Sequence, residues 1–282
     1  MHINYPGESS RLTAGAPSQA ALPCPPLEAV ATKPQARWII RLDGIVLAAG
    51  AARDGAANLL RAVAGRYVLV SSNSRDTART MAGKLKRLGM DVPERAIVLA
   101  GEEALRSVAA RFPGARCLVM ASRVLAHAAR GLGLDPVQDN AEIILLGRDS
   151  AWTYRDLTLV ANEMARGCRL MVSNGDVSTL GKGGRIIPDT GAILAAIEAV
   201  AGDRAADILR LSRGAVLRTA LERLGGEEAD AWLISDQEAD FEIAATIAGL
   251  RIFGSQPDRY GVSDYHAELD ATAQSGSTPL LP

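Results

Sequence analysis

The sequence has 282 residues, of which 48% are hydrophobic and 22% charged, and its formal net charge is -1. This length suits one large domain or two ordinary ones, with enough chain to bury a sizeable core. The near-neutral charge argues against nucleic-acid binding and against a polybasic membrane binder, because both need a strong positive field. No run of about 18 apolar residues occurs, so we expect no membrane-spanning helix.

In chain order, the first 35 residues are rich in Pro, Ala, Gly and Ser without hydrophobic periodicity, which is typical of a disordered tail. After them, short apolar runs alternate with segments of helical spacing. The apolar runs predicted as strands are 38–40, 45–47, 67–70, 96–99, 117–120, 143–146, 170–172, 231–234 and 251–253. The predicted helices are 56–64, 76–88, 102–112, 122–131, 153–166, 190–200, 216–224 and 241–250. This alternation predicts an α/β protein with a parallel sheet and helices on its faces.

The cysteines lie far apart, at Cys24, Cys117 and Cys168. None belongs to a CxxC pair or has a histidine at ligand spacing, so the pattern predicts neither a disulfide framework nor a structural zinc site. Free cysteines are typical of a reducing compartment, and we expect a cytoplasmic protein.

Three of the predicted strands end in polar segments. These segments are residues 41–44 (RLDG), 71–74 (SSNS) and 235–236 (SD). In open parallel sheets, ligands gather beyond the carboxyl ends of the strands, where the N-termini of helices also point. The sequence therefore predicts a ligand site where these three segments meet.

The polar residues in and after these segments can be interpreted in two ways. Hydroxyl and amide groups that open a helix can hold a phosphate, or Ser74 or Asp76 can simply be the N-cap of that helix. Asp43 and Asp236 can be a metal pair, or each can be a loop carboxylate in water. Spacing alone leaves these alternatives open.

Together the segments resemble the haloacid dehalogenase-like superfamily over residues 36–254. The nearest match is its subfamily with a large α/β cap, which includes 4-nitrophenyl phosphatases and nucleotide or sugar phosphatases. The family's DxDG and TNNS signatures are similar to residues 41–44 and 71–74. Its NPD and PGxGAL segments are similar to 174–176 (NGD) and 188–193 (PDTGAI), and its final GD is similar to 235–236.

The resemblance implies the organisation of the whole chain. We expect a Rossmann-like core with a parallel sheet, formed by residues 36–94 and 196–254. An α/β cap domain is expected as an insertion at 95–195, with tails at 1–35 and 255–282.

The departures from the family pattern bear on function. In the family, the first Asp of DxDG attacks phosphorus and binds magnesium, and the second protonates the leaving group. Here Arg41 stands at the first position and Asp43 at the second. A guanidinium offers no lone pair and stays protonated, so Arg41 cannot act as an aspartyl-type nucleophile. The family's phosphate-binding Lys falls near Leu211, between Arg210 and Arg213, and either Arg is open as its substitute.

We therefore expect a phosphatase-like protein with impaired chemistry that binds a phosphorylated small molecule or a partner. Whether it is an enzyme stays open. The alternatives are an active phosphatase by another route, such as attack by water assisted by Asp43, and a structural role with homodimer contacts through the cap. The residues that the resemblance implies for phosphate or substrate binding are Ser71, Ser72, Asn73, Asn174 and Asp176.

Magnesium, which the family uses, is expected to bind weakly or not at all. Asp236 is the family ligand that remains, and Arg41 replaces a neighbouring carboxylate with a cation. We expect Arg41 to lie in the place of the metal and to pair with Asp236, because a positive charge beside the ion would repel it.

Overall fold

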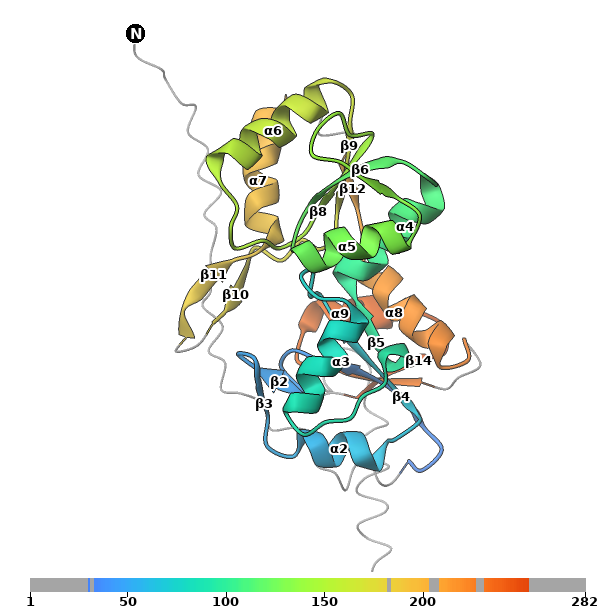
Figure 1. Ribbon diagram of the computed structural model, residues 1–282. Helices are drawn as coiled ribbons and strands as arrows, with labels where there is room; N and C mark the ends of the chain where they lie inside the picture. Colours follow the sequence, from blue (N-terminus) through green and yellow to red (C-terminus); the bar gives the residue numbers. More distant parts are fainter. Residues whose placement is uncertain (1–29, 31–32, 182–183, 203–207, 227–230, 254–282) are drawn as a thin grey trace, which may run out of the picture.

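The computed structural model describes residues 30, 33–181, 184–202, 208–226 and 231–253. The predicted tails lie outside these residues, apart from residues 30 and 33–35. Two five-stranded sheets form the framework, and helices cover both faces of each sheet (Figure 1). Among the described residues, no helix combines the length and the apolar character that a membrane span requires. The α/β class and the parallel sheets that the sequence predicts are confirmed.

The first sheet has the strand order β14-β13-β1-β4-β5, and every neighbouring pair is parallel. Its strands are β1 (Arg37–Arg41), β4 (Tyr67–Ser71), β5 (Ile97–Leu99), β13 (Ala231–Ile234) and β14 (Leu250–Phe253). Helices α2 (Ala56–Ala62) and α3 (Ala78–Arg87) contribute to the apolar cluster on one face. Helices α8 (Arg213–Arg223) and α9 (Glu238–Ala244) contribute to the cluster on the other. Alternation along β1 fills both layers, since Trp38 and Ile40 belong to the first cluster and Ile39 to the second.

The second sheet has the order β12-β9-β8-β6-β7 and is also parallel. Its strands are β6 (Arg116–Met120), β7 (Asp135–Pro136), β8 (Ile143–Leu146), β9 (Arg169–Val172) and β12 (Ile208–Arg210). Helices α4 (Ala100–Arg111) and α5 (Arg123–Gly131) pack on one face. Helices α6 (Tyr154–Ala165) and α7 (Thr190–Ala201) pack on the other.

Smaller elements complete the described chain. They are the hairpin β2–β3 (Leu47–Ala48 and Ala51–Ala52), the hairpin β10–β11 (Ser178–Leu180 and Ile186–Pro188) and the 3-10 turn η1 (Glu94–Ala96). Of residues 45–47, predicted as a strand, 45–46 instead form a turn and Leu47 begins β2. The helix predicted at 241–250 corresponds to α9, which begins earlier, at Glu238. It also ends earlier, at Ala244, and Leu250 belongs to β14.

The boundary between the two units lies later in the chain than predicted at both ends. Strand β5 pairs with β4 in the first sheet, and β12 pairs with β9 in the second. Both faces of β5 are apolar and buried in the two clusters of the first sheet, which fixes the strand there. We therefore call residues 100–211 the cap, and the described residues before and after it the core.

Candidate functional site

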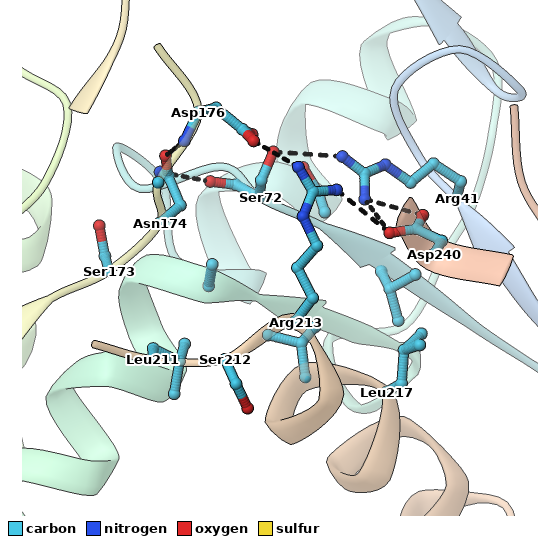
Figure 2. Close-up of a pocket in the computed structure, with 15 residues that line it drawn as sticks. Arg41, Ser72, Ser173, Asn174, Asp176, Leu211, Ser212, Arg213, Leu217 and Asp240 are labelled. Atoms are coloured by element: carbon cyan, nitrogen blue, oxygen red, sulfur yellow. Dashed lines mark hydrogen bonds and ion pairs between the residues drawn. The ribbon is translucent and has the colours of Figure 1, made fainter. Parts of the chain in front are cut away.

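The carboxyl ends of β1, β4 and β13 meet at one edge of the core sheet, as their parallel order requires. The cap loop that follows β9 lies over this edge, and a cavity of about 40 Å³ lies between them (Figure 2). The polar residues that line the cavity are Arg41, Ser71, Ser72, Ser173, Asn174, Asp176, Ser212, Arg213 and Asp240. Core and cap thus both contribute to the site, and most of the residues predicted for it are brought together there.

Arg41 is the last residue of β1, and the residue as a whole is 7% exposed. Its Nη1 donates to both carboxylate oxygens of Asp240, at 3.0 and 3.2 Å, and its Nη2 donates to Ser72 Oγ at 3.3 Å. Asp240 is 2% exposed and also accepts a hydrogen bond of 2.7 Å from Ser235 Oγ. The guanidinium is therefore held in a fixed position by a buried carboxylate.

The partner of Arg41 differs from the one predicted, which was Asp236. Asp236 follows Ser235 after the end of β13, and its carboxylate lies against Gly44: a Cβ on that glycine would be 2.0 Å from Asp236 Oδ2. Asp240 lies in the first turn of α9 and lines the cavity. The sequence showed Asp240 only as one of several acidic residues after β13, with no signal that it faces Arg41.

Arg213 extends the ion pair into a network. It is the first residue of α8, whose N-cap is Ser212. Its Nη1 donates to Asp240 Oδ1 at 3.2 Å, and its Nη2 donates to Asp176 of the cap loop (Figure 2). Arg210, the other substitute left open for the family Lys, pairs with Glu198 instead. Of the two, Arg213 is the one that lines the cavity.

Asp43 lies at the rim of this edge and is exposed. It accepts a hydrogen bond from Ser71 Oγ, which in turn accepts one of 3.0 Å from the backbone N–H of Asn73. Asp43 is therefore open to water and carries one oriented hydroxyl donor.

The side chain of Asn73 closes a turn. Its Oδ1 accepts from the backbone N–H groups of Arg75 and Asp76, and its Nδ2 donates to Asp76 Oδ2 at 3.0 Å. The N-cap of the next helix is Thr77, in a capping box with Thr80, so neither Ser74 nor Asp76 is that cap. Asn73 shapes the loop but does not line the cavity.

Asn174 ties the cap loop to the core. Its Nδ2 lies 2.9 Å from the backbone oxygen of Ser72, 3.0 Å from Ser74 Oγ and 3.3 Å from Thr190 Oγ1. The loop approaches the N-terminus of α7 so closely that a Cβ on Gly191 would be 2.4 Å from the backbone oxygen of Gly175. Because its amide donor is used in these bonds, Asn174 holds the loop in place, and Asp176 is the loop residue whose carboxylate meets Arg213.

Two buried polar atoms at the cavity lack a hydrogen-bond partner within the part of the chain that the structure describes. They are Arg41 Nε and Ser173 Oγ, and Ser173 is 1% exposed. Buried polar groups are nearly always paired, so these two atoms are exceptions among the residues that line the cavity. Ser173 was not among the predicted site residues.

The two described thiols do not serve the site. Cys117 and Cys168 are buried in the cap, and burial raises the pKa of each to about 12. The reactive form of cysteine is the thiolate, so neither is a nucleophile near neutral pH. Cys24 lies outside the described residues.

The donor set does not fit the magnesium ion that the resemblance implies. A hard cation needs several oxygen ligands converging on one point. Arg41 is a cation at the position where the resemblance implies a carboxylate, and Asp240 is bonded to Arg41 and Arg213. Among the described residues, no three acidic, His or Cys side chains gather in a way that could hold an ion.

Comparisons with known proteins agree on one family. A family model for haloacid dehalogenase-like hydrolases matches residues 38–135. Dihydroxyacetone phosphatase of Corynebacterium glutamicum is 23% identical over 203 residues, which are 71% of this chain and 73% of that protein. D-glycerol 3-phosphate phosphatase of Mycobacterium tuberculosis is 27% identical over 168 residues, which are 58% of this chain but only 47% of that protein.

Solved structures show the same fold. A glycerol phosphate phosphatase of Mycobacterium tuberculosis, solved in complex with calcium, matches with a TM-score of 0.68 and 25% identity. The match covers 79% of this chain and 66% of that one. A p-nitrophenyl phosphatase of Archaeoglobus fulgidus matches with a TM-score of 0.69 and 23% identity, over 83% of this chain and 93% of that one.

Proposed function

Because the chain belongs to the haloacid dehalogenase-like family, we propose that it binds a phosphorylated small molecule between core and cap without hydrolysing it through an aspartyl-phosphate. One observation carries the proposal. Arg41 ends the strand on which the resemblance implies a nucleophilic carboxylate, and Asp240 holds its guanidinium there. Loss of a covalent nucleophile costs on the order of 10⁴-fold or more in rate in comparable enzymes.

The polar groups around the cavity support an anionic ligand. Two guanidiniums, Arg41 and Arg213, present forked donors of the kind that match phosphate oxygens. Arg41 Nε and the hydroxyl of Ser173 add unpaired donors within the described structure. Relatives of this chain are named for D-glycerol 3-phosphate, sugars and nucleotides, which suggests a small phosphate monoester as the ligand.

A second candidate is hydrolysis without a covalent intermediate. Asp43 favours it, because this carboxylate is exposed, is oriented by Ser71, and could take a proton from an attacking water. In that case Arg41 would stabilise the charge of the transferring phosphoryl group. Turnover, rather than binding, separates the two candidates.

Binding is tested by thermal denaturation with inorganic phosphate and with glycerol 3-phosphate. We expect both to raise the melting temperature, since a ligand at 100 times its Kd stabilises the native state by about 2.7 kcal/mol. Arg213→Gln should abolish this shift. Arg210→Gln is the matched control and should keep it, because Arg210 pairs with Glu198 outside the cavity. If no phosphorylated compound shifts the native protein, the binding proposal fails and a structural role becomes the better account.

A further inference from the structure

We propose that Asp176 is an internal competitor of the ligand: its carboxylate occupies, on Arg213, the position that a phosphate oxygen takes when the ligand binds. The inference rests on the proposed function, because it assigns a regulatory contact to the same site.

The two carboxylates on Arg213 are held very differently. Asp240 is buried and is bonded to Arg41, Arg213 and Ser235 together, so it has no freedom to leave. The Asp176 side chain is 23% exposed, and Arg213 is its one cationic partner within 4.0 Å among the described residues. Of the two, Asp176 is the carboxylate that an incoming anion can replace.

The size of the cavity favours such a replacement. At about 40 Å³ it has room for roughly three water molecules, so a phosphate group would be crowded beside the present side chains. Movement of the Asp176 carboxylate away from Arg213 enlarges the cavity. It also frees a guanidinium N–H group pointed at the space that the carboxylate leaves.

The charges lead to the same conclusion. The network contains two cations, Arg41 and Arg213, and two anions, Asp176 and Asp240. As it stands the network is neutral and attracts an anion only weakly. Once Asp176 has moved out, one positive charge is uncompensated and a phosphate can replace the carboxylate.

The exchange also couples the ligand to the contact between core and cap. Asp176 belongs to the cap loop, whereas Arg213 begins a core helix, so their ion pair joins the two units. The hydrogen bonds of Asn174 to Ser72 and Ser74 are separate from this pair and can keep the loop in place while Asp176 moves.

The test is calorimetric titration of inorganic phosphate into native protein and into Asp176→Asn, which keeps the side-chain shape and removes the charge. We expect the variant to bind phosphate about fivefold more tightly, the effect of removing a partly exposed ion pair. Asp135→Asn is the matched control, because Asp135 is an exposed cap residue on β7, away from the cavity. It should leave the affinity unchanged. If Asp176→Asn is poorly folded by its melting curve, Asp176→Ala takes its place.

Each outcome decides between the claims. If native protein and the Asp176 variant bind phosphate equally, the competitor inference is wrong while the proposed function stands. If neither binds, both are wrong, since removing a competitor must reveal a site that exists. If only the variant binds, or binds more tightly, the inference is supported. The gain must then vanish in the double variant Asp176→Asn with Arg213→Gln, because the freed guanidinium is its source.

Discussion

Replacing Asp240 with asparagine should lower the free energy of unfolding by about 3–5 kcal/mol, the usual cost of breaking a buried ion pair by removing one partner. Asp240 is 2% exposed and faces Arg41, whose side chain is 9% exposed. An amide in its place leaves the Arg41 charge buried without a counter-ion. Arg213 adds less to this cost, because its side chain is 32% exposed and water screens its charge. Urea denaturation measures the change.

Asp236→Asn is the control for Asp240→Asn. Asp236 is half-buried and accepts a hydrogen bond of 3.3 Å from Gln237 Nε2, so its loss should cost about 1 kcal/mol at most. Comparing the losses in free energy of unfolding shows which aspartate forms the buried ion pair with Arg41. Equal losses, or a larger loss for Asp236→Asn, would contradict the network described here and restore the pairing predicted from the sequence.

Magnesium should bind the native protein only weakly, and Arg41→Asp should strengthen its binding by about 10³-fold or more. A unit positive charge about 4 Å from the ion repels it by about 4 kcal/mol at an effective dielectric constant of 20. The substitution removes this cation and adds a carboxylate. Strand β1 pairs with β13 in a register that matches Ile40 with Ile234, so the new carboxylate would lie beside the segment that contains Asp236. Calorimetric titration with magnesium chloride measures both affinities.

Arg41→Gln separates two effects of that substitution. It removes the cation and its ion pair with Asp240 but supplies no metal ligand, so it should bind magnesium less tightly than Arg41→Asp. A submillimolar magnesium affinity in the native protein would show that Arg41 does not exclude the ion.

The sheet and its active edge could be predicted from the sequence because both depend on local patterns. Short apolar runs give parallel strands, and the polar residues that follow β1, β4 and β13 then meet at one edge. That reasoning placed Arg41, Ser71 and Ser72 together, as the structure has them. It also gave Arg213 as one of two candidates to replace the family's phosphate-binding Lys.

The partners of these residues could not be predicted, because they depend on helix orientation and on packing between the units. The sequence does not show how α9 turns after β13, and that turn brings Asp240 rather than Asp236 to Arg41. The roles of Asn174 and Asp176 depend on how the cap loop meets the core. Asn174 was expected to contact the ligand, yet its amide is bonded to Ser72 and Ser74.

Hydrolysis of 4-nitrophenyl phosphate, followed with and without magnesium on protein shown by titration to bind phosphate, tests the central claim most directly. A site that holds phosphate without a nucleophile should release 4-nitrophenol no faster than buffer, whether or not magnesium is added. Turnover at an ordinary enzymatic rate, about 1 per second or more, would contradict the claim and make the active phosphatase the better account.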